Sequence, residues 1–391
     1  MSRLLLNPVV LVSPHSEGYV AYDTATNRLH QLNPTAALLV ELCDGSRTAE
    51  EVLVLAAPLL PPDSAGAVRA WLENAVEEEV LVQREEAELQ TVQELAAEDL
   101  AELADRLREN GQVQAAYLCQ QRASELRPED GDWLRSLGEL SHIVGKREEA
   151  RRAYEALLRR QPDDAEILHL LTSLRDDDAP PRAPDDCIRQ LYQRFAAFYE
   201  DNMCDELGYE GPMHLSDVIE RMLEQRRELT ILDLGCGTGL AGMAVAERAK
   251  RLVGVDLSPE MLEQAKQRGL YDELHVAEIT DWLSRHDERF DLVIACDTLI
   301  YFGDLTRVMK LAAEHLNDEG AFAFSVERSD SDDFRLTDNG RYVHHPRHIQ
   351  AAAEAAGMRV DAQQAAFLRM EYGEEVTGLY TGMRFDPTSS C

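Results

Sequence analysis

The sequence contains few cations for its length and no long apolar run. Its 391 residues include 39 lysines and arginines against 73 aspartates and glutamates, which gives a formal net charge of −34. Such a charge repels nucleic-acid phosphates and anionic lipids, so the sequence predicts neither a nucleic-acid partner nor a membrane partner. A cationic peptide or a small metabolite suits this surface better. At roughly 100–200 residues per domain, the length predicts two to four domains.

Membrane spans, signal peptides and paired cysteines are also missing from the pattern. The longest apolar stretch, Val52 to Leu60, contains a proline and is far shorter than the ~20 residues that cross a bilayer. Arg3 and the short run Leu4 to Leu6 lack the apolar core and the cleavage site of a signal peptide. The seven cysteines are odd in number, widely spaced and without a C-x-x-C pair. We therefore expect a cytoplasmic protein with reduced thiols and no metal ion.

Residues 1–82 combine short strands with a helical pattern. An antiparallel meander is predicted for three runs: Val9 to Val12, Gly18 to Thr24 and Arg28 to Leu32. Asn33-Pro34 predicts the start of a first helix, and Asp44-Gly45 predicts its end. Thr48 with Glu51 forms a capping box for a second helix, and Ala65 to Leu81 predicts a third. Three strands and three helices form a small winged-helix-like α+β unit.

The string YDTATNRLHQLNPTAALLVELCDGSRTAEEV resembles the PqqD family, whose small domains are also called RiPP recognition elements. The match covers nearly all of residues 5 to 82. It implies that the leader of a ribosomally made precursor peptide adds as a strand beside the third strand, next to the third helix, with affinity from backbone hydrogen bonds. The implied peptide-binding residues are Arg28, Leu29, His30, Gln31, Leu32 and Trp71. The alternative is a structural winged helix without a ligand.

Residues 97–173 contain an internal repeat with the 34-residue spacing of tetratricopeptide (TPR) units. The positions in register are Leu103 with Leu137 and Leu171, Gly111 with Gly145, Ala116 with Ala150, and Pro128 with Pro162. The pattern predicts all-α TPR hairpins, two complete and one extra helix, which either bind a peptide or act as a spacer. Residues 174–187 are charged and rich in proline, which predicts a linker.

Residues 188–391 alternate apolar strands with helical stretches, which is typical of a parallel, Rossmann-like α/β sheet. The predicted strands are Thr230 to Gly235, Leu252 to Ser258, Leu274 to Glu278, Phe290 to Asp297 and Gly320 to Glu327. Ligands of such sheets bind at the carboxyl ends of the strands. There the segment ILDLG leads directly into Cys236-Gly237-Thr238-Gly239 and a helix. Asp256 ends the next strand, where its carboxylate can accept hydrogen bonds from two ribose hydroxyls.

Two nucleotide ligands fit this turn. Gly237 to Gly242 satisfies the G-x-G-x-x-G pattern, so a dinucleotide site is formally possible. However, Asp256 follows Gly242 too closely for that pattern. Asp233 also places a negative charge just before the turn, which disfavours a pyrophosphate and attracts an ammonium group. S-adenosylmethionine carries such an ammonium group.

The strings LDLGCGTGLAG and VDLSPEML resemble the class I S-adenosylmethionine-dependent methyltransferases, and the resemblance continues through FDLVIACDTLIYFGDL, GAFAFSVE, GRYVHH and LRMEYGEEVTG. Together with the preceding repeats, this part of the sequence is similar to the group of predicted methyltransferases that carry tetratricopeptide repeats. It implies S-adenosylmethionine as the cofactor and S-adenosylhomocysteine as its product. The implied cofactor-binding residues are Asp233, Gly235, Cys236, Gly237, Gly239, Asp256, Leu257, Met261, Glu278, Ile279 and Asp297.

The resemblance also implies where some of these residues lie. Asp233 would lie near the methionine portion, Asp256 would hold the ribose, and Met261 would flank the adenine. Glu278 with Ile279 would contact the adenine edge, and Glu278 stands where an aspartate is expected. The aromatic residues Phe195, Phe198 and Tyr199 either cover the cofactor as a lid or pack in the core.

Methyl transfer from a sulfonium requires alignment and, for a weak acceptor, removal of a proton. His344 is the first candidate base, because it falls after the fifth strand, where the acceptor should enter, and histidine titrates near neutrality. Further candidates are His345, Tyr301, Tyr342 and Glu327. The alternative for each is a polar residue with a structural role. An acceptor carboxylate is ionised at neutral pH and would need no base.

Together the three segments predict a methyltransferase that holds the leader of a precursor peptide and modifies a distal core residue, with an oxygen acceptor favoured. Other maturation enzymes are possible partners. Two alternatives are a catalytically silent peptide-binding adaptor and a small-molecule methyltransferase.

Overall fold

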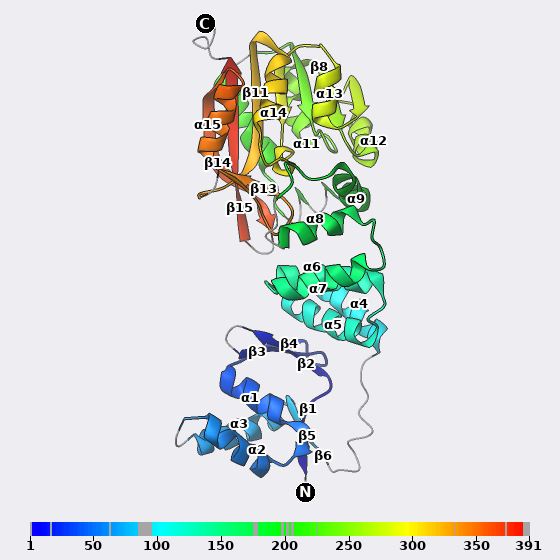
Figure 1. Ribbon diagram of the computed structural model, residues 1–391, viewed down its shortest axis with the longest axis vertical. Helices are drawn as coiled ribbons and strands as arrows, with labels where there is room; N and C mark the ends of the chain where they lie inside the picture. The colour runs from blue at the N-terminus through cyan, green and yellow to red at the C-terminus, as the bar shows by residue number, and fades with distance from the viewer. Residues whose placement is uncertain are drawn as a thin grey trace. The chain divides into compact units, whose positions relative to one another are not determined.

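Figure 1 shows the computed structural model of the chain, which divides into an N-terminal unit, Met1–Pro162, and a C-terminal unit, Asp163–Cys391. The structure describes residues 2–15, 18–61, 64–84, 96–174, 179–196, 199–200, 203–204, 207–224, 226–331, 333–371 and 374–385. Phe198 lies outside these residues, as does part of the predicted linker. Within these ranges, no helix is long and apolar enough to cross a membrane.

The N-terminal unit begins with two three-stranded antiparallel sheets and three helices. One sheet has the order β2 (Val10–His15), β3 (Gly18–Asp23), β4 (Arg28–Leu32). The other has the order β5 (Asp44–Arg47), β1 (Arg3–Leu6), β6 (Leu81–Arg84). The helices are α1 (Pro34–Leu42), α2 (Ala49–Ala56) with the 3-10 turn η1 (Ala57–Leu59), and α3 (Ala65–Glu77). The predicted meander and the three helices are confirmed.

The second sheet was not predicted, and it changes two element ends. Leu81, which we expected at the end of a helix, begins β6, and Asp44 begins β5 instead of only ending α1. The predicted starts of the first two helices are confirmed. The Asn33 side chain accepts a hydrogen bond from the amide of Ala36 at 2.9 Å, and Thr48 forms a reciprocal capping box with Glu51.

Four helices follow in the N-terminal unit: α4 (Ala97–Glu109), α5 (Val113–Leu126), α6 (Gly131–Ile143) and α7 (Arg147–Leu158). They form two hairpins, whose turns contain Gly111 and Gly145 at φ of +71° and +78°. This left-handed backbone explains why the repeat has glycine at both turns. Val20 and Tyr22 of β3 belong to the same buried cluster as Ala116 of α5, so the sheet packs on the helices.

The C-terminal unit is built around a nine-stranded sheet within the described residues. Its main path has the order β12-β13-β11-β10-β7-β8-β9, and β15 pairs with β11 and β14. The strands are β7 (Leu229–Leu234), β8 (Ala249–Asp256), β9 (Glu273–Val276), β10 (Phe290–Ala295), β11 (Leu316–Arg328), β12 (Phe334–Leu336), β13 (Tyr342–His344), β14 (Met358–Glu371) and β15 (Glu374–Phe385). Strands β9, β8, β7, β10 and β11 are mutually parallel, so the predicted Rossmann-like α/β fold is confirmed.

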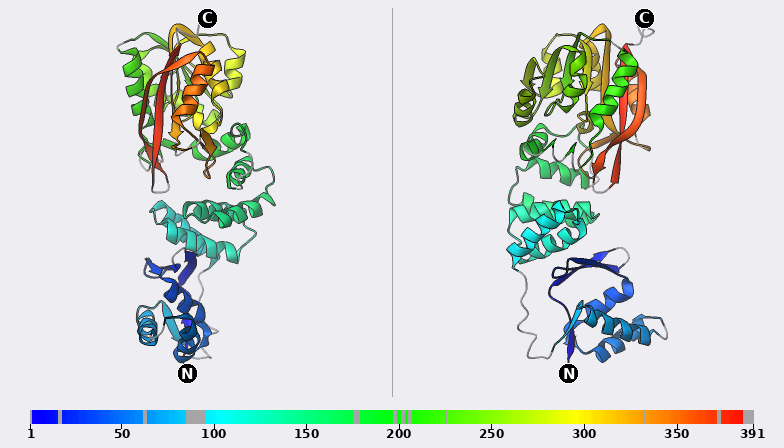
Figure 2. Two further views of the ribbon diagram at one scale, coloured as in Figure 1. Left: turned by 60° about the vertical axis from the view of Figure 1, so that its left-hand side comes forward. Right: turned by 180° about the vertical axis from the view of Figure 1, so that it is seen from behind.

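Helices cover both faces of this sheet (Figures 1 and 2). One buried cluster joins the strands to α13 (Ile279–Arg285), α14 (Thr306–Glu314) and α15 (Pro346–Ala355). The other joins them to α10 (Gly211–Leu223) and α11 (Leu240–Val245). The remaining helices are α8 (Ala165–Leu174), α9 (Asp185–Phe195) and α12 (Pro259–Arg268), with the 3-10 turns η4 (Ala246–Arg248) and η5 (Leu299–Tyr301).

Helix α8 lies in the C-terminal unit, although the repeat pattern groups it with the helices before it. His169 Nε2 lies 2.8 Å from the carbonyl oxygen of Gly340, and the hydroxyl of Ser173 donates to Asp338 O at 2.9 Å. The described part of the predicted linker also packs here. The amide of Ala183 donates to Tyr301 O at 2.8 Å, and Ala183 is buried.

The close contact between α6 and α7 gives a first prediction. A Cβ atom at Gly138 would lie 2.6 Å from Cδ1 of the buried Tyr154 ring. We expect Gly138→Ala to lower the free energy of unfolding of the N-terminal unit by about 1–3 kcal/mol, because overpacking outweighs the gain in helix propensity. Gly66→Ala in α3 is the control, since its Cβ would meet nothing within 4 Å. Urea denaturation of both variants tests this, and equal effects would contradict it.

Candidate active site

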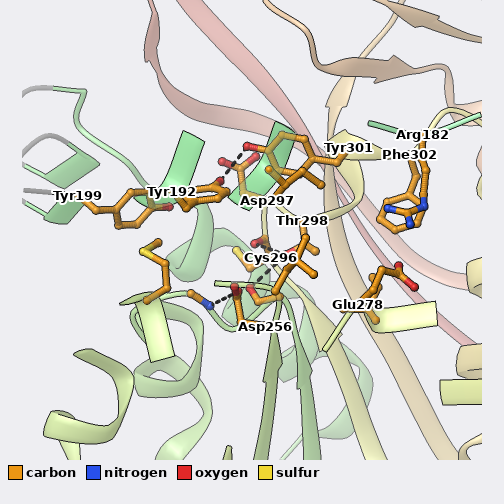
Figure 3. A pocket seen from close by; sticks show the side chains of 16 residues that line it. Arg182, Tyr192, Tyr199, Asp256, Glu278, Cys296, Asp297, Thr298, Tyr301 and Phe302 are labelled. Carbon is orange, nitrogen blue, oxygen red and sulfur yellow. Dashed lines mark hydrogen bonds between the residues drawn. The ribbon is translucent and has the colours of Figure 1, made fainter. Parts of the chain in front are cut away.

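A pocket lies at the carboxyl ends of β7, β8, β9 and β10 in the C-terminal unit (Figure 3). The predicted cofactor-binding residues that line it are Gly235, Gly237, Asp256, Leu257, Met261, Glu278, Ile279 and Asp297. Asp233, Cys236 and Gly239 are not on its wall; the first two are buried beside the turn. Its position agrees with the rule that ligands of open α/β sheets bind beyond the carboxyl ends of the strands.

The turn between β7 and α11 has a backbone that requires glycine. Gly235, Gly237 and Gly239 have φ values of +68°, +53° and +93°. A Cβ atom at Gly235 would lie 2.9 Å from Cβ of Thr298. The glycines therefore let the backbone pass directly beneath the segment after β10, whose Thr298 also lines the pocket.

Asp256 is held by backbone amides at the end of β8. Its Oδ2 accepts a hydrogen bond from the amide of Gly237 at 2.8 Å, and its Oδ1 accepts one from Ser258 at 2.8 Å. Burial raises the pKa of Asp256, and these hydrogen bonds oppose the rise. Each oxygen retains acceptor capacity, so the carboxylate is fixed in place and can receive two hydroxyl donors.

Glu278 caps α13 and faces the pocket. Its Oε2 accepts hydrogen bonds from the amide of Asp281 at 2.7 Å and from the hydroxyl of Thr280 at 2.6 Å. Its Oε1 is buried and has no hydrogen-bond partner within the described part of the chain. An orphaned carboxylate oxygen of this kind fits a ligand with an N–H or O–H donor.

Tyrosine side chains line another part of the wall. The hydroxyls of Tyr301 and Tyr192 lie 2.8 Å apart, and the ring centroids of Tyr192 and Tyr199 lie 5.9 Å apart. Figure 3 shows Tyr192 and Tyr199 on one side of the pocket and Glu278 on the other. Burial raises the pKa of all three phenols. They therefore carry protons at neutral pH and serve as hydrogen-bond donors, not as bases.

The structure does not bring the histidine candidates to this pocket. His344 is fully buried (0% exposed), and its Nε2 lies 2.9 Å from Gly303 O, so that nitrogen donates. Burial lowers the pKa of His344 to about 4. His345 caps α15 by accepting from the amide of Arg347 at 3.1 Å. Residues Tyr342–His344 form β13, and neither His344 nor His345 is among the residues that line the pocket.

Tyr342 and Glu327 are also outside the pocket wall. The Tyr342 hydroxyl donates to the carbonyl oxygen of Pro180. Glu327 accepts a hydrogen bond from Arg369, and its pKa is raised by burial, against the opposing effect of Arg369 and Arg341. Among the candidate bases, Tyr301 alone contributes to the lining.

Sequence reasoning missed Arg369 of β14, which is 1% exposed behind the pocket wall. Its Nη1 donates to both oxygens of Asp297, at 2.9 and 3.2 Å, and its Nη2 donates to Glu371 at 3.2 Å. Arg341 completes the cluster with hydrogen bonds of 2.7 Å to both oxygens of Glu371. The sequence did offer one indication of its role, because a charged arginine stands within the strand-forming string FLRMEY.

The peptide-binding candidates lie together in the N-terminal unit. β4 pairs only with β3, and no strand of the described residues pairs with its other edge. Leu29 is 48% exposed on this edge. Leu32 is buried in a cluster against which Trp71 of α3 packs. Arg28, His30 and Gln31 complete β4.

The buried cluster around Arg369 gives a second prediction. We expect Arg369→Gln to lower the free energy of unfolding of the C-terminal unit by about 3–5 kcal/mol, because carboxylates remain buried without their cation. The loss should shrink as the pH falls, since protonation removes their charge. Arg285→Gln is the control: its pair with Asp281 is exposed (75% and 59%), so we expect less than about 1 kcal/mol. Urea denaturation of both variants at pH 5 and pH 8 measures these losses. The prediction would be wrong if Arg369→Gln lost no more stability than Arg285→Gln, or lost as much at pH 5 as at pH 8.

Residues 231–320, which include β7 to β10, match the family model of the methyltransferase domain. The YqeM protein of Bacillus subtilis (strain 168) is 35% identical over 150 residues, which are 36% of this chain and 56% of that protein. The ubiquinone biosynthesis O-methyltransferase of Coxiella burnetii (strain Dugway 5J108-111) is 26% identical over 176 residues, 39% of this chain and 75% of that enzyme. The chain thus spans little more than half the length of YqeM.

The structure of the 1,6-didemethyltoxoflavin-N1-methyltransferase of Burkholderia thailandensis, with 1,6-didemethyltoxoflavin and S-adenosylhomocysteine bound, covers 54% of this chain and 94% of that one at 20% identity and a TM-score of 0.42. The matched residues 231–320 supply the glycine turn, Asp256 and Glu278 of the pocket. The C-terminal unit therefore contains a methyltransferase domain.

Proposed function

We propose that the chain methylates a ribosomally made precursor peptide, whose leader docks on β4 and whose core residue enters the pocket of the C-terminal unit. The observation that carries the methyl transfer is the pocket itself. A glycine turn and an amide-bound Asp256 meet there within residues that match a methyltransferase domain. The proposed cofactor is S-adenosylmethionine. It would supply a methyl group on a cationic sulfonium, and the positive charge makes this methyl group electrophilic without activation by a metal or an acid.

The residues present fit this cofactor. Asp256 would accept hydrogen bonds from the two ribose hydroxyls, and the unpartnered Oε1 of Glu278 would accept one from the adenine amino group. Met261 and Ile279 supply buried apolar surface on the pocket wall for the adenine ring. Asp233 adds a buried negative charge next to the turn, on the side where a cationic amino acid portion would lie.

The tyrosines would orient the acceptor. Tyr192, Tyr199 and Tyr301 present protonated hydroxyls to the pocket. None of its described lining residues is a histidine. A carboxylate acceptor is ionised at neutral pH and can attack without a base, and phenol donors would hold it in line with the methyl group. We therefore propose that the chain methylates an oxygen atom of its acceptor, most favourably a carboxylate oxygen.

The free edge of β4 supports the docking part of the proposal. An added strand would gain backbone hydrogen bonds along Arg28–Leu32 and side-chain contacts with Leu29 and Trp71. Glu73 and Glu77 to Glu79 are exposed on or just after α3. A leader with basic residues would therefore associate faster, and salt would slow it.

A small-molecule acceptor is the second candidate. This candidate is supported by the similarity to the Coxiella protein, which is an O-methyltransferase of ubiquinone biosynthesis. The two candidates differ in what the N-terminal unit does. Peptide methylation requires the β4 edge, whereas methylation of a free small molecule would not change when that edge is blocked.

Asp256→Ala tests the cofactor site. We expect its affinity for S-adenosylmethionine to fall by about 2–3 kcal/mol, because two charge-assisted hydrogen bonds to the ribose are lost. Asp281→Ala is the control, because this carboxylate is exposed and forms an ion pair at 3.6 Å with Arg285, one turn later in α13. Calorimetry measures both variants. Equal affinities, or a wild type that binds no S-adenosylmethionine, would contradict the proposal, and tight binding of a nicotinamide dinucleotide would favour the other nucleotide ligand.

Leu29→Lys tests leader docking. A lysine on the β4 edge should hinder strand addition and repel a basic leader. We expect KM for a precursor peptide that carries its leader to rise about tenfold or more, with kcat nearly unchanged, because docking is shared by ground and transition states.

Two controls accompany this test. Leu59→Lys introduces the same charge at an exposed position of η1 and should leave KM unchanged. A core peptide without a leader should be methylated equally by Leu29→Lys and by the wild type. If the full precursor were methylated no better than the core peptide, the docking proposal would be wrong.

A further inference from the structure

Tyr271 occupies the space beneath the glycine turn, although no motif assigned it a role. It lies between α12 and β9 and packs against one of the two buried clusters of the sheet. A Cβ atom would lie 3.1 Å from its ring at Gly239, 2.7 Å at Gly242 and 3.0 Å at Gly254. The three glycines therefore leave room for this ring, at Gly239 together with Arg268 and at Gly254 together with Leu274 and Cys236.

This packing accounts for the third glycine of the G-x-G-x-x-G pattern. Gly242 lies in α11, where an added Cβ would overlap Cζ of Tyr271. The tyrosine therefore requires a glycine at this position, whichever ligand binds at the turn.

The hydroxyl of Tyr271 reaches Asp233 of β7. It donates to Oδ2 at 2.7 Å, and Asp233 is fully buried (0% exposed). The second oxygen, Oδ1, has no hydrogen-bond partner among the described residues. A buried carboxylate oxygen without a donor is costly unless a ligand satisfies it.

Among the residues that the structure describes, the groups that face Asp233 include no cation. They are the Tyr271 hydroxyl, the Asp256 carboxylate of β8, and the thiols of Cys236 in the turn and Cys296 after β10. Within the described residues, the hydroxyl of Tyr271 is therefore the one donor to this carboxylate. A cationic group from outside would complete the site.

We infer that Tyr271 is a positioning residue of the cofactor site, which orients Asp233 so that its free oxygen receives the ammonium group of S-adenosylmethionine. The inference rests on the proposed function, because that function supplies the cation. Tyr271 touches no ligand itself; it acts through Asp233.

The ionisation of Asp233 provides the readout. Burial raises its pKa to about 7, whereas the hydrogen bond from Tyr271 lowers it and the charge of Asp256 raises it. The ammonium binds the ionised form, so apparent affinity depends on the ionised fraction. Without the hydroxyl the pKa rises further, and a higher pH is needed to reach the same fraction.

The experiment compares wild type, Tyr271→Phe and Tyr380→Phe by calorimetric titration of the full chain with S-adenosylmethionine from pH 6 to pH 9. Phenylalanine keeps the ring beneath the turn. Tyr380 is the control, because its buried hydroxyl donates to Phe367 O at 3.0 Å, outside the pocket lining. The ratio of variant to wild-type affinity is the measured quantity, because the titration of the ligand itself cancels in it.

For a pKa displaced by about one unit, we expect Tyr271→Phe to bind about fivefold more weakly at pH 7 and nearly as tightly as wild type at pH 9. Tyr380→Phe should give a ratio that does not change with pH. A constant ratio for Tyr271→Phe, whether one or smaller, would overturn the inference, because a merely structural loss acts at every pH. A wild type that binds no S-adenosylmethionine would overturn the proposed function as well.

Discussion

The left-handed backbone between β7 and α11 is the constraint on which the cofactor half of the pocket depends. Gly235 passes beneath Thr298 with no room for a side chain, and the amide of Gly237 holds Asp256. One turn conformation therefore fixes both a stretch of exposed backbone and a carboxylate from the neighbouring strand. Tyr271 fills the space on the inner side of the same turn. A ligand that binds here meets groups already in place, so little ordering free energy opposes binding.

The position of Asp297 on the pocket wall depends on a cluster of buried charges. Asp297 has φ of +53°, and its carboxylate is held by Arg369, which lies 72 residues later in the chain. Arg369 is in turn surrounded by Glu327 and Glu371. Burial raises the pKa of Glu371, but Arg341 and Arg369 together lower it below its ordinary value. Because each member compensates the burial of another, the orientation of Asp297 is a property of the whole cluster and not of its own strand.

Local signals predicted the elements well and the side-chain partners poorly. Apolar runs that alternate with helical stretches, together with one glycine-rich turn, were enough to predict the parallel sheet and the positions of Asp256 and Glu278 at its edge. His344 was predicted to lie after the fifth strand, where the acceptor should enter, yet β13 pairs with β11 and buries it. Neither Tyr271 nor Arg369 could be assigned a role, because their partners come from strands distant in sequence. The sheet β5-β1-β6 was missed for the same reason, since its strands are separated by whole helices.

The segment before α9 helps to form the pocket wall, although it lies outside the residues that match the methyltransferase domain. Its prolines and charges predicted a linker, yet Pro180 and Pro181 use their carbonyl oxygens to accept hydrogen bonds from Tyr342 and Gly303. This anchoring brings Arg182, Ile188, Tyr192 and Tyr199 to the pocket wall. All four precede the residues that match the methyltransferase domain, which begin at 231. The matched residues supply Asp256 and Glu278 to the pocket, whereas these four side chains come from the segment that connects the domain to the helical repeat. Under the proposed function, these four residues contribute to the choice of the methyl acceptor.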